Sequence, residues 1–376
     1  MKIREFGVEI WMNEFENDCE FNLAETCVDS LTIAQLIEIS GKNDTVMADL
    51  AAMKMTYGAI DGSDRLRAAI CGLYQGQARE NVIVTHGTIG ANALIYQALV
   101  SRGDHVISVL PTYQQHYSIP ESIGAQVGIL PLREANGFLP DLDELAAMVR
   151  PDTRLVAINN PNNPTGALMD RDMFMGVVEI ARGCGAYLLC DEVYRGTDQD
   201  GDGSTVSVAD LYEKGISTAG MSKAFSLAGL RLGWIAGPVE VIKAVSIHRD
   251  YDTISVGVVD DYFATMALEA GDKILARSRA ITRANLGILD AWMSGEPSMS
   301  YVKPKSATVA LLKYDFDMPS QEFCRKLLQE TGVMLTPGSA MDMEGYVRIG
   351  YANDGAVIAA GLEKLSGFLA GLRAQL

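Results

Sequence analysis

The sequence predicts an α/β fold in which helices cover both faces of a mostly parallel sheet, followed by a smaller α+β unit. Three observations predict it. Short apolar runs alternate with segments of helical spacing over residues 82–236. These runs are continuously apolar, which is typical of strands buried on both faces of a parallel sheet. Beyond residue 260 the alternation stops, and long helices mix with single strands.

The large sheet is predicted from runs rich in Val, Ile and Leu, such as VIVT and HVISV. Strands are expected at residues 82–85, 105–109, 126–130, 154–158, 186–190 and 216–219, with a further apolar run at 232–236. Between them, apolar residues recur every three or four positions, which predicts helices at residues 88–100, 113–122, 141–149 and 170–182. Ligands of such sheets gather at the carboxyl ends of the strands, so functional residues are expected directly after them.

The C-terminal part predicts a smaller unit. One or two long helices are expected over 260–294, then strand 301–313, helix 320–331, strand 346–350 and helix 355–375. Composition does not change between the two parts, so the domain boundaries are approximate. We expect an N-terminal segment (1–45) joining the small domain, a large domain (46–250), connecting helices (251–290) and a small domain (291–376).

The composition indicates an acidic globular protein. Of 376 residues, 48% are hydrophobic and 21% charged, which excludes disorder and fibrous repeats. The net charge of −17 counts against nucleic acid or an anionic membrane as partner, although a local basic pocket remains compatible with it. The N-terminus lacks the apolar region of a signal peptide, and no run of about 18 apolar residues occurs. We therefore expect a cytoplasmic protein.

Neither a disulfide framework nor a metal site is expected. The six cysteines form no CxxC pair, and the four histidines lack metal-ligand spacing. Asp198, Asp200, Asp202 and Gly203 match the start of a calcium-binding loop, but its twelfth position is Ala209 where a Glu is needed. An acidic surface loop is the simpler interpretation.

The strongest motif surrounds Lys223. It reads GMSKAF over residues 220–225 and continues as GLRLG over 229–233. A single lysine after a strand is usually a solvated surface residue. Here a second cation, Arg231, follows eight residues later, and glycines surround both. A lysine that forms a Schiff base needs a lowered pKa, which burial and nearby positive charge can supply.

Three further motifs follow predicted strands. Asp191, in CDEVY, either points into the ligand crevice or caps the next element. Residues 159–166 (NNPNNPTG) have the composition of a turn. Residues 85–90 (THGTIG) lead a strand into a helix through glycines, a turn that presents N–H groups to a phosphate.

In this order and spacing, the four motifs resemble the pyridoxal-phosphate-dependent aminotransferases of fold type I, in the aspartate-aminotransferase-like class I/II group. The resemblance extends from residues 57–62 (YGAIDG) to residues 346–350 (YVRIG). It implies pyridoxal 5′-phosphate as cofactor, a seven-stranded sheet in the large domain and a homodimer. It also implies transfer of an amino group between an amino acid and a 2-oxo acid.

The resemblance assigns roles around the cofactor ring. Lys223 would hold the cofactor through a Schiff base and later move a proton on the substrate. Asp191 would pair with the pyridine nitrogen and keep it protonated, which makes the ring an electron sink. Tyr194 and Asn163 would hydrogen-bond the ring hydroxyl oxygen, and Tyr113 would stack on the ring.

The resemblance also assigns the anion-binding groups. Arg231 would bind the phosphate, together with the backbone N–H groups of Thr88 and Ile89 and the hydroxyl of Ser222. Many relatives carry a further serine at the position of Gly220. The remaining assignments concern Tyr57, which would reach the phosphate of a neighbouring subunit, and Arg348, which would clamp the substrate α-carboxylate with help from Asn163.

The chain departs from the family at residues 21–27, where relatives often carry a Gly-Pro-rich stretch. Glu25 in this segment either faces the substrate and favours a cationic or polar side chain, or is a surface acid. No motif matches the arginine that reads dicarboxylate side chains. Arg249 is a conceivable substitute, but a solvated helix face is its simpler interpretation.

Other chemistry remains open. A pyridoxal-phosphate-dependent lyase or biosynthetic enzyme, catalysing elimination, decarboxylation or cyclisation, would use the same motifs. A regulatory domain that binds the cofactor without catalysis is disfavoured, because the motifs start by residue 57 and leave little room for a DNA-binding domain.

Overall fold

The computed structural model describes residues 2–43, 45–203 and 205–375. Its largest sheet has seven strands in the order β2-β8-β7-β6-β5-β3-β4. Only β8 runs antiparallel to its neighbours, so the predicted mostly parallel sheet is confirmed. The strands are β2 (Val82–His86), β3 (His105–Leu110), β4 (Gln126–Pro131), β5 (Thr153–Asn159), β6 (Tyr187–Asp191), β7 (Gly215–Gly220) and β8 (Leu232–Ala236).

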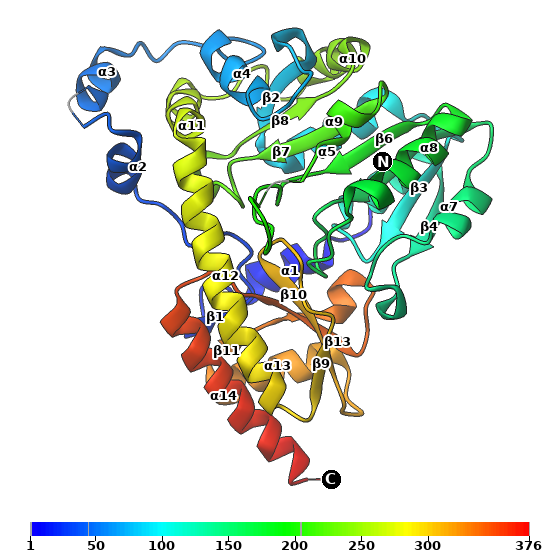
Figure 1. The fold of residues 1–376 in the computed structure, drawn as a ribbon, viewed down its shortest axis with the longest axis vertical. Coiled ribbons are helices and arrows are strands. Elements are labelled where there is room, and N and C mark those ends of the chain that lie inside the picture. The colour runs from blue at the N-terminus through cyan, green and yellow to red at the C-terminus, as the bar shows by residue number, and fades with distance from the viewer. Residues whose placement is uncertain (1, 44, 204, 376) are drawn as a thin grey trace.

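Helices cover both faces of this sheet (Figure 1). Along β3, Val106 packs in the core under α5 and α10, whereas its neighbour Ile107 packs in the opposite core under α7 and α8. Both side-chain directions are therefore buried, which explains the continuous apolar runs of the sequence. The helices of this part are α4 (Asp64–Cys71), α5 (Gly87–Leu99), α6 (Gln115–Ile123), α7 (Leu142–Met148), α8 (Arg171–Cys184), α9 (Val208–Leu211), α10 (Val239–Arg249) and α11 (Val258–Glu269).

The C-terminal part forms a second sheet with helices against it. The long helical region predicted over 260–294 is two helices, and the second, α12, runs down the molecule to reach this part (Figure 1). The sheet has the order β12-β13-β10-β9. Its elements are α12 (Gly271–Gly295), β9 (Met299–Tyr301), β10 (Val309–Tyr314), α13 (Ser320–Thr331), β12 (Thr336–Pro337), β13 (Tyr346–Gly350) and α14 (Gly355–Arg373).

The single strand predicted over 301–313 is wrong. The chain leaves β9 after Tyr301 and re-enters the sheet at Val309, where β10 pairs antiparallel with β9. Pro304 has no N–H to donate, and the N–H groups of Lys305 and Ser306 donate to the Gly166 carbonyl instead of to a strand. A contact with a residue distant in the sequence therefore holds this loop, which the apolar pattern does not reveal.

The N-terminal segment has structure that the sequence pattern did not predict. It contains α1 (Gly7–Phe15), β1 (Phe21–Asn22) and α2 (Ile33–Ser40), and α3 (Val46–Ala52) follows it. Strand β1 pairs in parallel with β11 (Val333–Met334), and Trp11 Nε1 donates to the Leu335 carbonyl at 2.8 Å. The start of the chain is thus held against the C-terminal part. The boundaries of the domains stay a prediction.

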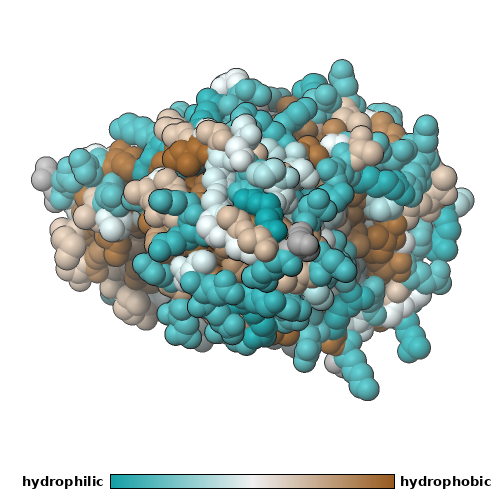
Figure 2. Space-filling view, turned by 90° about the horizontal axis from the view of Figure 1, so that it is seen from below, coloured by the Kyte–Doolittle hydropathy of each residue, from teal (hydrophilic) through white to brown (hydrophobic). Residues whose placement is uncertain are grey.

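Helix α14 is long and apolar enough, by length and composition alone, to cross a membrane. In this fold it packs against α12 and α13, and its apolar face joins the core of the C-terminal part. Figure 2 shows the molecule from the end where α14 lies, and hydrophilic residues cover most of that face, with hydrophobic residues in separate patches. Core packing accounts for the apolar residues of this helix.

Candidate active site

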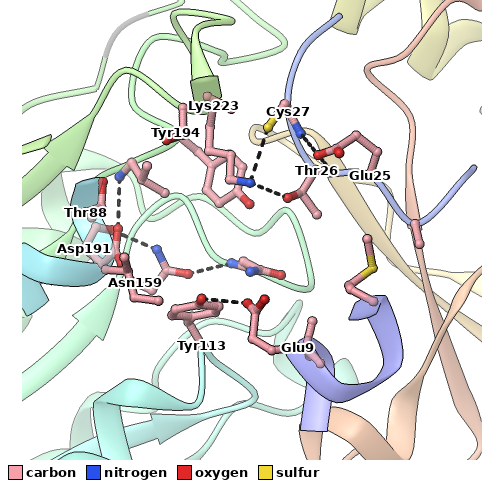
Figure 3. Close-up of a pocket in the computed structure, with 18 of the residues that line it drawn as sticks. Glu9, Glu25, Thr26, Cys27, Thr88, Tyr113, Asn159, Asp191, Tyr194 and Lys223 are labelled. Carbon is pink, nitrogen blue, oxygen red and sulfur yellow. Dashed lines mark hydrogen bonds between the residues drawn. The ribbon is translucent and has the colours of Figure 1, made fainter. Parts of the chain in front are cut away.

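A cavity of about 520 Å³ lies beside the carboxyl ends of β5 and β6, and residues of the N-terminal segment also line it (Figure 3). Tyr57 does not line it; its side chain is 75% exposed. Every other residue predicted for the site does. They are Thr88, Ile89, Tyr113, Asn163, Asp191, Tyr194, Ser222, Lys223, Arg231 and Arg348. The fold thus gathers residues spread over most of the chain.

Lys223 lies in the turn after β7 and is half-buried. Its Nζ donates to Thr26 Oγ1 at 2.6 Å and lies 3.5 Å from Cys27 Sγ (Figure 3). The predicted lowering of its pKa is wrong for this state. Burial lowers the pKa of Lys223, but Cys27, Tyr194 and the Glu25 carboxylate raise it more, so it lies above its ordinary value.

Arg231 is held in a strained conformation beside the start of α5. Its φ of 47° lies in the left-handed region, which costs roughly 1–3 kcal/mol for a residue other than glycine. Its guanidinium lies so close to Gly87 that a Cβ there would approach Nη2 to 3.0 Å. Gly87 itself has φ of +66°. The strained turn therefore brings a guanidinium to the N-terminus of a helix, where an anion is stabilised.

The hydroxyl of Thr88 completes this anion-binding corner. Its Oγ1 is buried and has no hydrogen-bond partner among the described residues. A Cβ at Gly220 would come within 2.7 Å of that oxygen, so a serine at 220 would collide with it. The missing serine thus leaves space for a hydroxyl supplied from α5. A guanidinium, a free hydroxyl and helix N–H groups together fit a phosphate.

Asp191, the last residue of β6, is 4% exposed. It accepts from Asn92 Nδ2 at 2.9 Å and from the Val193 N–H at 3.1 Å, and His116 Nε2 lies 3.5 Å away. Thr218 Oγ1 donates to Asn92 Oδ1, which fixes the amide so that its Nδ2 faces Asp191. The carboxylate therefore faces the cavity while also making the capping contact.

Sequence reasoning missed Asn92 and His116. Asn92 is 1% exposed and His116 is fully buried, and each is a polar residue in a buried helix. Tyr96 OH lies 2.9 Å from His116 Nδ1. An amide among the apolar residues of 88–100 was the available signal, because buried polar side chains need partners.

Arg348, on β13, is only 3% exposed, which rules out a surface position. It donates to Asn163 Oδ1 at 3.3 Å and to Thr336 Oγ1 at 3.2 Å, while its Nε has no partner among the described residues. Burial lowers the pKa of Arg348, although Tyr194 and Glu25 oppose this effect. A buried guanidinium with an unused N–H fits a carboxylate from a ligand.

Glu25 lines the cavity, so the structure favours the first of its two interpretations. Its Oε1 accepts from the backbone N–H groups of Thr26 and Cys27, at 2.7 and 2.9 Å. A Cβ at Gly350 would lie 1.7 Å from the Glu25 carbonyl oxygen, so this backbone packs directly on β13. Burial raises the pKa of Glu25, but Lys223 and the Cys27 N–H together lower it by more. The pKa of Glu25 therefore lies below its ordinary value.

We expect a fall in pH to lower the free energy of unfolding more for the wild-type protein than for the Glu25→Gln variant. Because its pKa is lowered on folding, Glu25 contributes stability above its ordinary pKa of 4.5, and that contribution is lost as pH falls below this value. Urea unfolding at neutral pH and in acid measures the loss. Glu38→Gln, at an exposed position on α2, should follow the wild type. Equal losses for Glu25→Gln and wild type would contradict a stabilising charge.

Two secondary expectations need correction. Arg249 does not lie on a solvated face; it is 1% exposed, donates to the Val84 carbonyl at 2.8 Å and pairs with Asp61. It does not line the cavity either. Asp198 is 7% exposed and accepts from Ser306 Oγ, so the acidic loop is anchored inside at its first residue. Burial raises the pKa of Asp198.

Comparisons with known proteins agree with this geometry. The profile of the family described as aminotransferase class I and II matches residues 32–365. Capreomycidine synthase of Streptomyces vinaceus is 28% identical over 363 residues, covering 96% of this chain and 92% of its own. A crystal structure of a PLP-dependent aminotransferase from Streptococcus suis 89-1591 has a TM-score of 0.96 and 43% identity, with 99% of each chain covered. The PLP-dependent cyclase OrfR has a TM-score of 0.91 and 28% identity, covering 100% of this chain and 99% of its own.

Proposed function

Since this chain belongs to the aminotransferase class I and II family and its cofactor is pyridoxal 5′-phosphate, we propose that it transfers an amino group between an amino acid and a 2-oxo acid. One observation carries the proposal. Lys223, Asp191 and Arg348 line a single cavity that also contains a phosphate-binding corner. A nucleophilic amine, an acid for a ring nitrogen and a carboxylate-binding guanidinium are what this reaction requires.

The residues present fit the cofactor. Arg231, Thr88 and the start of α5 would hold its phosphate, as the unpartnered Thr88 hydroxyl indicates. Asp191 would hold the proton on the ring nitrogen. Tyr113, Tyr194 and Asn163 would contact the ring and its hydroxyl, as predicted. When bound, pyridoxal phosphate supplies a carbonyl for capture of an amine and an electron-withdrawing ring that stabilises negative charge on the substrate.

The protein's own groups would then position the substrate and move its proton. Arg348 binds the α-carboxylate and thereby fixes the α-carbon relative to Lys223. Lys223, as a free amine, would accept the α-proton on Nζ and then donate it to a different atom. The raised pKa of Lys223 in the cofactor-free site keeps that nitrogen protonated there, so the amine is freed only once its surroundings change.

We also propose a cytoplasmic homodimer. Tyr57 is 75% exposed and Met55 is 79% exposed, whereas the other predicted site residues apart from Ile89 and Arg231 are buried or half-buried. Large apolar side chains at such exposure favour contact with another protein surface. In a homodimer Tyr57 would reach the phosphate of the other subunit.

The alternative is a cyclising or eliminating enzyme on the same scaffold. The likeness to OrfR, a PLP-dependent cyclase, over the whole chain favours keeping this alternative. It would use the same three residues and differ in the fate of the substrate after proton removal.

Product analysis decides between the two. We expect the loaded enzyme, mixed with a panel of amino acids in a single turnover, to release a 2-oxo acid and retain the amino group. Addition of a second 2-oxo acid should then yield its aminated form, measured by mass spectrometry with a nitrogen-15 label. Release of labelled ammonia, or of a cyclised amino acid that keeps its label, would contradict amino transfer.

A further inference from the structure

Three carboxylates from the N-terminal segment line the cavity: Glu16, which is exposed, and Glu9 and Glu25, which lie on the side opposite Asp191 (Figure 3). We call Glu9 and Glu25 the acidic pair. Glu9 lies on α1 and accepts from Tyr113 OH at 3.0 Å. Both are half-buried, and among the described residues neither forms an ion pair with a lysine or arginine. In this state Lys223 and two backbone N–H groups stabilise the charge of Glu25, whereas the hydrogen-bond donor to the Glu9 carboxylate among the described residues is Tyr113 OH. Once Lys223 is bonded to the cofactor, a cation from a ligand can stabilise both carboxylates.

Both positions are built rather than accidental. The backbone of Glu25 is packed against Gly350 of β13, as described above. Helix α1 is fixed by the Gly7 N–H, which donates to Gln114 Oε1 at 3.0 Å, and by Trp11, which donates to Leu335. The acidic pair is therefore held in place before any ligand binds, which reduces the entropic cost of binding one.

The charge balance of the loaded site singles out the acidic pair. In the proposed function the phosphate neutralises Arg231, the substrate α-carboxylate neutralises Arg348, and the ring nitrogen pairs with Asp191. Lys223 is taken up by the cofactor. Every cation that lines the cavity then has a partner, and three carboxylates remain without one: Glu16, which is exposed to solvent, and the half-buried Glu9 and Glu25.

A second observation fixes the direction of the ligand. Arg348 is 3% exposed, and its Nε lacks a partner among the described residues, so one end of the ligand is anionic. Glu9 and Glu25 line the same cavity as Arg348, so a ligand whose carboxylate is held by Arg348 can reach them with its other end. A cavity of about 520 Å³ accommodates an extended amino acid between these groups.

We propose that Glu9 and Glu25 bind a cationic group, an ammonium or a guanidinium, on the side chain of the substrate, so that the preferred substrate is a basic amino acid. The inference rests on the proposed function for the placement of the α-carboxylate. It explains why no arginine for an acidic side chain lines this side of the cavity among the described residues.

Unreactive ligands test the proposal without any turnover. Calorimetry on the loaded wild-type enzyme would compare δ-guanidinovalerate with its neutral counterpart δ-ureidovalerate, and ε-dimethylaminocaproate, whose tertiary amine cannot form a Schiff base, with 7-methyloctanoate. These lack the α-amino group, so they measure binding alone. We expect at least one cationic ligand to bind roughly 10- to 100-fold more tightly than its neutral counterpart, the range for a charged hydrogen bond. The two cationic arms distinguish guanidinium from ammonium.

Variants then locate the effect. Glu9→Gln and Glu25→Gln each remove a charge and keep an oxygen that can accept the same hydrogen bonds. Each variant should bind the cationic ligand about tenfold or more weakly than the wild type does, and its affinity for the neutral ligand should be unchanged. Glu14→Gln is the matched control. Glu14 also lies on α1, but it pairs with Arg325 and does not line the cavity.

Equal binding of cationic and neutral ligands to the wild type would overturn the proposal, and this comparison needs no variant to fold. An equal loss of affinity for the cationic and the neutral ligand in Glu9→Gln would also overturn the proposal, because that pattern indicates a structural role of Glu9 through Tyr113. If cationic ligands bind selectively but amino acids yield no amino transfer, the proposed function fails while the acidic pair stands.

Discussion

Lys223→Ala should abolish turnover, with a loss of roughly 10⁴-fold or more, because the variant lacks both the amine that holds the cofactor and the base that moves the α-proton. The covalent link should vanish as well. Treatment of the wild type with borohydride should leave the cofactor attached to the peptide that contains Lys223, as mass spectrometry can detect. In the variant the cofactor should be lost on denaturation.

Lys243→Ala provides the control. Lys243 is exposed on α10 and does not line the cavity, so its removal should change neither turnover nor the reducible link. Full activity of Lys223→Ala would show that another residue captures the cofactor. Loss of activity with an intact link would mean that a different lysine forms it.

Asp191→Asn should reduce turnover by roughly 10²–10³-fold, which is typical when one electrostatic partner of a transition state is removed. Asparagine has the same shape and can keep the hydrogen bond from the Val193 N–H. It lacks the negative charge that favours a protonated ring nitrogen. The visible spectrum and the equilibrium affinity for the cofactor should therefore change together with the rate.

A comparison with Asp191→Ala separates charge from packing. Both substitutions leave the buried Asn92 amide without its acceptor, which costs roughly 1–3 kcal/mol of stability, because an asparagine that accepts from the Val193 N–H turns its own Nδ2 toward Asn92. Alanine loses the bond from the Val193 N–H as well, so we expect both variants to lose turnover and the alanine variant to lose more stability in thermal unfolding. Near-normal turnover of Asp191→Asn would show that Asp191 acts through packing alone.

Local patterns predicted most of the large sheet. The strands at 105–109 and 232–236 and the helix at 320–331 were identified to within a residue, since their periodicity directly reflects which faces are buried. The hairpin of β9 and β10 was missed, because the contacts of its loop with Gly166 are distant in sequence.

The site was predicted in the same uneven way. Lys223, Asp191 and Arg348 follow strands in recognisable motifs, and the structure places all three around one cavity. Glu9 and Thr26 were not identified, because they lie in a segment whose position depends on pairing between β1 and β11. No local pattern reports such a partner across the chain.

Sequence alone therefore indicated the fold class and the residues that follow the strands, because burial and turn chemistry are local properties. The cofactor followed from the resemblance of the motifs to a known family. Tertiary structure decided which charges surround Lys223. Glycine at 220 is required by the Thr88 hydroxyl, and the pKa of Lys223 is raised by groups almost two hundred positions away. Electrostatic energy depends on distance in space, and only folding brings the acidic N-terminal segment to the cationic cavity.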